Sequence, residues 1–301
     1  MSMHLEDFSQ FGNLELLARQ MVEGFITGLH KSPYHGFSVE FAEHRLYNSG
    51  ESTRHIDWKV FAKTDRLYTK RYEEETNLRC HLVLDASPSM YYPQPDNAKI
   101  RFSVMAAAAI TYLLHRQRDA VGLFTFSEGL DSQTEVKSSA THIHKLFLAL
   151  DGLLHQQPET GATDVAGVLH TIASKIHRRS LVVIFSDMFQ RSDDLDTIFA
   201  ALQHLRHNKH EILIFHVTDQ ETELHFEFED RPYEFIDLET QEKIKVKPQE
   251  VKKYYAERMG NFYQDLKLRC GQFKIDFIEA DVKQSFDSIL EAYFIKRGKM
   301  S

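Results

Sequence analysis

The segment DASPS, residues 85–89, places three oxygen-bearing side chains directly after the apolar run RCHLVL. Short apolar runs of this kind are typical of buried strands. In an open α/β sheet, ligands bind at the carboxyl ends of the strands, so Asp85, Ser87 and Ser89 would lie where a small site can form. One carboxylate and two hydroxyl groups suit a hard cation, which prefers oxygen ligands.

Two further positions repeat this arrangement. Ser186 and Asp187 follow the apolar run SLVVIF, and Thr163 stands in a loop just before a helical pattern. Each feature alone also has a structural explanation, because such residues are common in turns and helix caps. If the strands are neighbours, the side chains meet at one edge of a sheet. Their combination predicts a Mg²⁺ site, with Mn²⁺ or Ca²⁺ as alternatives, formed by Asp85, Ser87, Ser89, Thr163 and Asp187.

The elements that must position these residues alternate along the chain from residue 79 onward. Strands are expected at 79–84, 120–126, 180–185, 211–217 and 273–278, with a further polar edge strand at 132–138. Helices are expected at 99–116, 143–154, 164–176, 193–207, 250–268 and 285–295. This alternation predicts an α/β fold with a doubly wound, mostly parallel sheet flanked by helices.

Two regions depart from the alternation. Residues 222–247 read as a β-hairpin insertion, in which HFEFED and YEFID are two strands around Arg231-Pro232, followed by KIKVK. Residues 1–78 contain one amphipathic helix at 12–29 and a stretch rich in Gly, Arg, Tyr and acids, so we expect an N-terminal α+β extension before a main domain at 79–301.

The net charge, the cysteines and the apolar runs limit which partners and which location we expect for this protein. The chain has 301 residues and a net charge of −8, which favours cations or proteins as partners and argues against nucleic acid. Its two cysteines, Cys80 and Cys270, are far apart and outside any Cys-x-x-Cys pair, so a cytoplasmic location is expected. Neither a signal peptide nor a membrane anchor is expected, since the longest apolar runs fall short of the roughly 18 residues that a span requires.

The histidines and the N-terminal block are two alternative places for a binding site. The 17 histidines are scattered, and His142 and His144 would point away from one another on either a strand or a helix, so a histidine metal site is not favoured. The basic and aromatic residues between 45 and 72 are largely neutralised by nearby acids, which favours packing or partner docking over nucleic-acid binding.

The strand followed by Asp85-x-Ser87-x-Ser89, the later Gly161-Ala162-Thr163-Asp164 and the strand ending in Ser186-Asp187 resemble the metal-ion-dependent adhesion site of von Willebrand factor type A domains. The block from Gly36 to Leu78 is similar to the signature segment of the bacterial domain-of-unknown-function family 58. One departure is Pro88, which should stiffen the loop without forbidding a bound ion.

The resemblance implies a type A, Rossmann-like domain that binds Mg²⁺ and, through it, an acidic residue of a protein partner. It implies that Ser87, Ser89 and Thr163 contact the metal, while Asp85 and Asp187 act directly or through waters. It also implies a non-enzymatic adaptor for a MoxR-type AAA+ ATPase. Candidate partner-contact residues are Arg54, Asp57, Trp58 and Asp164.

Two other functions stay open at this point. An aspartate after a strand is also how haloacid-dehalogenase-like phosphatases place a nucleophile, so a metal-dependent hydrolase using Asp85 is the main alternative. Those enzymes have a second carboxylate two residues later, where this chain has Ser87, and the common hydrolase and nucleotide motifs are missing. In a third reading, the protein is a scaffold whose site no longer functions.

Overall fold

The computed structural model describes residues 13–29, 44–46, 61, 63, 68–70, 78–156, 163–177, 179–189, 195–238, 240–284 and 291. By its internal contacts the chain divides into two units, residues 1–25 with 78–301, and residues 26–77. The predicted helix at 285–295 lies largely outside the described residues.

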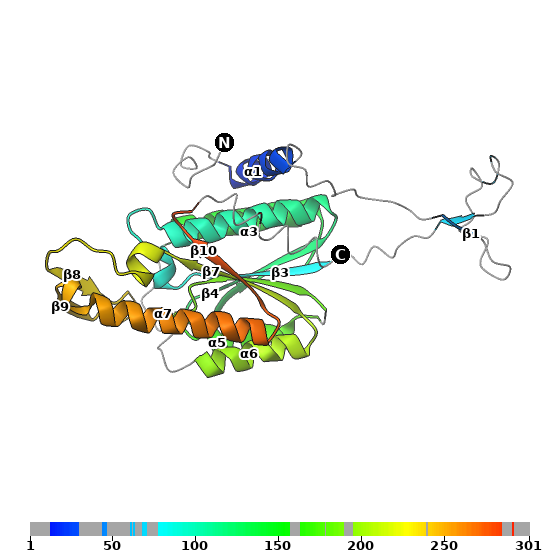
Figure 1. Cartoon of the computed structure of the whole chain (residues 1–301). Coiled ribbons are helices and arrows are strands. Elements are labelled where there is room, and N and C mark those ends of the chain that lie inside the picture. The colour runs from blue at the N-terminus through cyan, green and yellow to red at the C-terminus, as the bar shows by residue number, and fades with distance from the viewer. Residues whose placement is uncertain are drawn as a thin grey trace. The chain divides into compact units, whose positions relative to one another are not determined.

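A six-stranded sheet forms the centre of the larger unit, in the order β10-β7-β6-β3-β4-β5 (Figure 1). Its strands are β3 (Arg79–Asp85), β4 (Ala120–Phe126), β5 (Leu130–Gln133), β6 (Leu181–Ser186), β7 (Glu211–Thr218) and β10 (Asp276–Asp281). All neighbouring strands are parallel except β5, which pairs antiparallel with β4 at one edge. The expected doubly wound, mostly parallel α/β architecture is confirmed.

Helices cover both faces of this sheet. They are α3 (Ala98–Arg116), α4 (Ala140–His155), α5 (Val165–Lys175), α6 (Leu195–His207) and α7 (Pro248–Gln272). Figure 1 shows α3 along one face and α5, α6 and α7 along the other. Because the strands are covered on both sides, β6 is buried along its whole length, as its continuous apolar sequence predicts.

Helix α1 spans Leu14–Leu29, and its residues up to Phe25 belong to the larger unit. Leu17, Ala18 and Val22 are buried, and the hydroxyl of Tyr112 on α3 donates a hydrogen bond to Glu23 Oε1 at 3.1 Å. The first turns of the predicted N-terminal helix therefore belong with the sheet domain. Among the described residues, none of the helices combines the length and apolar character that a membrane crossing needs.

The insertion after β7 differs from its prediction. After the short helical turn η4 (Gln220–Leu224), the segment HFEFED forms no strand, and YEFI of β8 (Tyr233–Ile236) pairs with KIKV of β9 (Lys243–Val246) in a separate antiparallel sheet. This register places Glu234 opposite Lys245, a pair of opposite charges.

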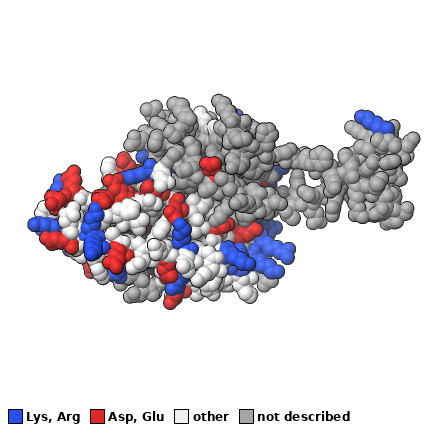
Figure 2. All heavy atoms as spheres, in the orientation of Figure 1, with Lys and Arg blue, Asp and Glu red and all other residues white. Residues whose placement is uncertain are grey.

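Aromatic side chains make a small core of their own beneath this insertion. Phe226 lies with its ring centroid 4.4 Å from that of Tyr255 on α7 and 5.4 Å from that of Phe235 on β8. On the face that Figure 2 shows, acidic and basic residues are interspersed over the described surface. The hairpin follows this pattern, with Lys243 and Lys245 both close to Glu234.

The last described strand begins later than predicted. The run FKIDFI suggested a strand at 273–278, but α7 continues to Gln272 and β10 spans Asp276–Asp281. Phe273 is the residue at the end of α7, and Lys274 has a positive φ of 55° that turns the chain into the strand. The apolar residue at this position is explained by packing, because Phe273 lies against the core beside Phe199, with ring centroids 5.7 Å apart.

The smaller unit contains one described strand pair. β1 (His44–Leu46) and β2 (Tyr68–Lys70) run antiparallel, with Arg45 opposite Thr69.

Candidate cation-binding site

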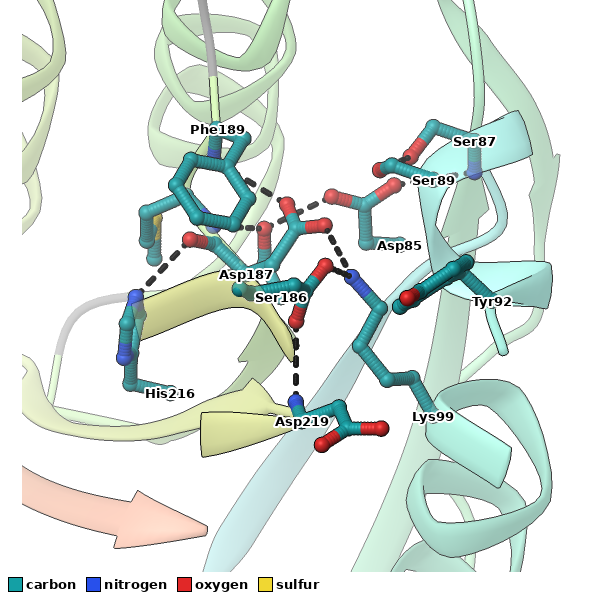
Figure 3. Close-up of polar contacts among 12 residues, drawn as sticks. Asp85, Ser87, Ser89, Tyr92, Lys99, Ser186, Asp187, Phe189, His216 and Asp219 are labelled. Atoms are coloured by element: carbon teal, nitrogen blue, oxygen red, sulfur yellow. Dashed lines mark hydrogen bonds and ion pairs between the residues drawn. The ribbon is translucent and has the colours of Figure 1, made fainter. Parts of the chain in front are cut away.

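The two predicted aspartate motifs meet at the carboxyl ends of adjacent strands. Asp85 is the last residue of β3 and Ser186 the last of β6, and the two strands are neighbours. The hydroxyl of Ser186 donates a buried hydrogen bond of 2.6 Å to Asp85 Oδ2 (Figure 3). The two motifs, about a hundred residues apart, therefore lie at the same edge of the sheet, while the metal site itself stays a prediction.

The loop after Asp85 turns its two serines toward one another. The backbone N–H of Ser87 donates to Asp85 Oδ1 at 2.9 Å, which closes a tight turn directly after the strand. Ser87 is the cap residue of the short helix η3 (Pro88–Tyr91), and Pro88 starts that helix, where a fixed φ is favourable. The hydroxyl oxygens of Ser87 and Ser89 lie 3.1 Å apart, with Ser87 buried and Ser89 partly exposed.

Thr163 is buried and stands two residues before α5, while Gly161 and Ala162 lie outside the described residues. The hydroxyl of Tyr91 in η3 donates to the carbonyl oxygen of Leu153 at 3.1 Å. This bond joins the serine loop to the last turn of α4, the helix that leads into the segment carrying Thr163.

Asp164 is the cap residue of α5. Its Oδ1 accepts from the backbone N–H of Gly167 at 2.8 Å, as expected for an aspartate at this position. A Cβ atom at Gly167 would lie 2.1 Å from Asp164 Oδ2, so a larger residue there would displace this carboxylate from its present position. A partner contact by Asp164 stays a prediction.

A buried lysine that sequence reasoning missed binds the second aspartate. Lys99 Nζ lies 2.9 Å from Asp187 Oδ2 and 2.5 Å from Glu223 Oε1, and the Lys99 side chain has no exposed surface. The other oxygen of Asp187 accepts from the backbone N–H of Phe189 at 3.0 Å. α3, the end of β6 and η4 are thus joined by one ammonium group (Figure 3).

The surroundings of this ion-pair group are aromatic and well bonded. Lys99 Nζ lies 5.8 Å from the ring centre of Tyr92 and 5.7 Å from that of Phe189. Glu223 Oε2 accepts from the backbone N–H of Asp219 at 2.8 Å. On the other side, His216 Nε2 donates to the carbonyl oxygen of Asp187 at 2.8 Å, which holds the chain directly after β6 in place.

Burial dominates the electrostatics of the site. Loss of water, followed by the nearby negative charge of Asp187, raises the pKa of Asp85 to about 7. Burial opposes the charged form of Lys99, yet Asp187 and Glu223 outweigh it and raise the pKa of the lysine. Burial also raises the pKa of Glu223, against the lowering effect of Lys99. Among the described residues, the site therefore gathers three largely buried carboxyl groups around one ammonium group, and burial opposes the charged form of Asp85 and Glu223.

The predicted residues thus divide into three groups. The structure brings together Asp85, Ser87, Ser89 and Asp187, and it places Thr163 on the segment that leads from α4 to α5. Arg54, Asp57 and Trp58 lie outside the described residues. Within the described part of the chain, no group of three or more His, Cys, Asp or Glu side chains is arranged to hold a metal ion.

One signal in the sequence could have drawn attention to Lys99, although it does not identify the partners of this residue. A cation in the first turn of a helix opposes the helix dipole, and this lysine stands between the small apolar Ala98 and Ile100. Such a residue needs a local anion to explain it. Glu223 gave no comparable signal, because its role depends on a contact across 124 positions of the chain.

Comparison with known families identifies the region around this site. Residues 43–261 match the family described as "Protein of unknown function DUF58". Among curated proteins, the uncharacterized proteins Rv1480 of Mycobacterium tuberculosis and Mb1516 of Mycobacterium bovis are each 26% identical to this chain over 206 residues. The match covers 68% of this chain and 63% of each relative, so the chain spans less than two thirds of their length.

Solved structures with a similar fold include BatB from Bacteroides thetaiotaomicron, which is 13% identical with a TM-score of 0.41 and coverage of 74% of this chain and all of the other. An aerotolerance-related membrane protein from Bacteroides fragilis is 13% identical, with a TM-score of 0.45 and coverage of 72% and 99%. A von Willebrand factor type A protein from Catenulispora acidiphila is 12% identical, with a TM-score of 0.35 and coverage of 50% and 34%.

Proposed function

The chain belongs to the DUF58 family, and from the chemistry of its site we propose that it binds Mg²⁺ and presents the ion to an acidic side chain of a protein partner. In this proposal the protein is a binding module and not an enzyme. The metal would be held at the carboxyl ends of β3 and β6 by Asp85, Ser87, Ser89 and Thr163, with Asp187 nearby.

The spacing of the two serine hydroxyls supports this proposal most directly. Mg²⁺ takes octahedral oxygen ligands at about 2.0–2.1 Å, so adjacent ligands on one ion lie about 2.9 Å apart. Ser87 Oγ and Ser89 Oγ are 3.1 Å apart before any ion is considered. The backbone bond from Ser87 to Asp85 Oδ1 holds the carboxylate beside them. These side chains therefore fit a small divalent ion without large rearrangement.

The burial of the two aspartates and the partial exposure of Ser89 also support the binding of a cation. Asp85 and Asp187 are both buried, and a buried carboxylate is costly unless a cation or donors compensate it. Ser89 is partly exposed, which leaves a side of the site open toward solvent. When bound, the ion would supply a positive charge that can take one carboxylate oxygen from outside. The chain's own residues would hold that charge in place and keep water from its inner side.

The identity of the partner is a finer proposal, and it rests on the family resemblance of the motif and its flanking block. We propose a MoxR-type AAA+ ATPase that offers an aspartate or glutamate, in the cytoplasm. Pull-down of the purified ATPase with and without EDTA tests this step separately from metal binding. Retention of the ATPase in EDTA would refute a metal-bridged contact.

Calorimetric titration with MgCl₂ tests the metal site. Wild type should bind one ion, Asp85→Asn should weaken binding by roughly tenfold or more, and Ser87→Ala with Ser89→Ala should do the same. Ser174→Ala is the matched control, because this hydroxyl is exposed on α5 and bonds only the helix backbone at His170. Near-ultraviolet circular dichroism checks that each variant is folded. Unchanged Mg²⁺ affinity in Asp85→Asn would refute the assignment.

The same variants test the hydrolase alternative. A phosphatase that used Asp85 as nucleophile would hydrolyse p-nitrophenyl phosphate with Mg²⁺ present and lose that turnover in Asp85→Asn. The binding module should show no turnover above buffer in either protein. Turnover that depends on Asp85 would replace the proposed function by an enzymatic one.

A further inference from the structure

Lys99 is a fully buried ammonium group inside the candidate site. It contacts Asp187 Oδ2 at 2.9 Å and Glu223 Oε1 at 2.5 Å, and both partners come from elements far apart in the sequence. A buried charge of this kind is retained only when its partners compensate the loss of water. Because the lysine touches one of the proposed site residues directly, its charge is part of the field that a bound metal ion would experience.

The two aspartates of the site are not equivalent. Asp85 accepts from the neutral backbone N–H of Ser87 and the neutral hydroxyl of Ser186, so no described cation offsets its charge directly. Asp187 accepts from Phe189 and from the positive Lys99, so its charge is already offset within the fold. An incoming cation would meet one carboxylate that no described cation contacts and one that the lysine has largely neutralised.

The formal charges around Lys99 show how this residue changes the net charge of the site. When all three are ionised, as beside a bound cation, Asp85, Asp187 and Glu223 are three carboxylates around one ammonium, which leaves two negative charges in excess. Asp219, also buried, has its own cation, since Lys283 Nζ lies 3.6 Å from Asp219 Oδ1. A divalent ion would therefore bring this group close to neutrality. Without the lysine, the same loaded site would keep one excess negative charge.

We propose that Lys99 determines the ligand specificity of the site, by weakening its hold on the divalent cation and strengthening the hold of the loaded site on an acidic partner. This inference rests on the proposed function. The physical reason is that the ammonium repels the metal ion and attracts an incoming carboxylate, so its two effects have opposite signs. The ion then stays positive enough to recruit an anionic ligand from outside.

Opposite signs separate this role from a purely structural one. If Lys99 only held α3, β6 and η4 together, its removal would loosen the whole site and weaken the binding of cation and carboxylate alike. A specificity residue instead gives a gain in one and a loss in the other. The measurement must therefore follow both ligands on the same variants.

The probes are Mn²⁺ and acetate. Mn²⁺ affinity is measured by electron paramagnetic resonance of the free ion, and acetate is then titrated into Mn²⁺-loaded protein while water-proton relaxation reports displacement of metal-bound water. Lys99→Met keeps the length of the side chain and removes its charge. This variant should bind Mn²⁺ roughly tenfold more tightly and acetate several-fold more weakly than wild type.

Glu223→Gln is the variant of opposite charge. It keeps the lysine paired with Asp187, so it avoids an uncompensated buried charge, and it should bind Mn²⁺ more weakly and acetate more tightly. The double variant Lys99→Met with Glu223→Gln restores the excess charge of wild type. Both affinities should therefore return toward the wild-type values.

The outcomes distinguish this inference from the proposed function. If wild type binds no Mn²⁺, or binds it equally well in Asp85→Asn, the proposed function fails. If wild type binds Mn²⁺ through Asp85 but Lys99→Met and Glu223→Gln weaken both ligands, only the role of Lys99 fails. If Lys99→Met does not fold, Glu223→Gln alone decides, because a loss of acetate binding in that variant overturns the inference.

Discussion

Acidification should destabilise this protein through His81, which lies inside strand β3. The side chain is 5% exposed, and within the described part of the chain neither ring nitrogen has a hydrogen-bond partner. Burial, followed by the neighbouring His210, His177 and Arg79, lowers the pKa of His81 from 6.5 to about 4. The folded protein therefore keeps this ring neutral at a pH where the unfolded chain takes up a proton.

The direction and the size of the change in unfolding free energy follow from this difference in pKa. A histidine whose folded pKa lies below its unfolded pKa contributes full stability above about pH 6.5, and that stability is lost as the pH falls toward 4. A shift from 6.5 to about 4 corresponds to about 3 kcal/mol of unfolding free energy over the whole window. At pH 5, roughly 2 kcal/mol of it should already be lost.

Urea denaturation of wild type and His81→Phe at about pH 7.5 and pH 5 measures the effect. Phenylalanine has a similar shape and can pack beside Phe124, whose ring centroid lies 5.6 Å from that of His81. The fall in unfolding free energy between the two pH values should be about 2 kcal/mol smaller in His81→Phe. Other titrating groups, including His216, are present in both proteins and cancel in this comparison. An equal fall in the two proteins would refute the reasoning.

Three further substitutions have effects that the described contacts determine. Asp164→Ala removes the cap of α5 and should lower the unfolding free energy by about 1 kcal/mol in urea denaturation. Gly122→Ala should lower it by about 1–3 kcal/mol, because the new Cβ would lie 2.9 Å from Val136 Cγ2. Gly152→Ala on α4 should raise it by up to about 1 kcal/mol, since nothing lies within 4 Å of the new Cβ and alanine favours a helix.

Each of these has its own check. Asp164→Asn preserves a capping oxygen and should lose only a fraction of what alanine loses. The two glycine variants serve as controls for one another, because the same added methyl group should have opposite effects in the two places. Equal destabilisation by both would contradict the packing derived for the strand and the helix.

Much of the fold follows from the sequence because the sheet is buried on both faces. Strands β3, β4, β6 and β7 were predicted nearly to their ends, since a strand covered on both sides must be apolar along its length. One error lies at the polar edge, where a strand was expected at 132–138 and β5 spans Leu130–Gln133. Others occur where apolar residues serve another element. Phe226 and Phe228 were assigned to a strand, but they pack into the aromatic core beneath the insertion.

The candidate site was predicted only in part, for a related reason. Asp85, Ser87, Ser89 and Asp187 directly follow strands, so the neighbourhood of β3 and β6 is enough to bring them together. Lys99 and Glu223 lie on other elements, and their meeting depends on how α3 and η4 pack over the edge of the sheet. Local patterns carry no information about such packing. The charge of the site, which those two residues set, therefore required the structure.

The position of β3 within the sheet has a consequence for how the molecule fluctuates. β3 lies between β4 and β6, and it is buried from Cys80 to Asp85, so neither edge of the sheet reaches it. Partial opening begins at elements with little cover, such as β5 at one edge and β10 at the other. The backbone amides of β3 should consequently exchange hydrogen only when the whole domain unfolds. The strand end that carries Asp85 would then keep its geometry during every partial unfolding event. A ligand would find this end of the strand formed for as long as the domain is folded.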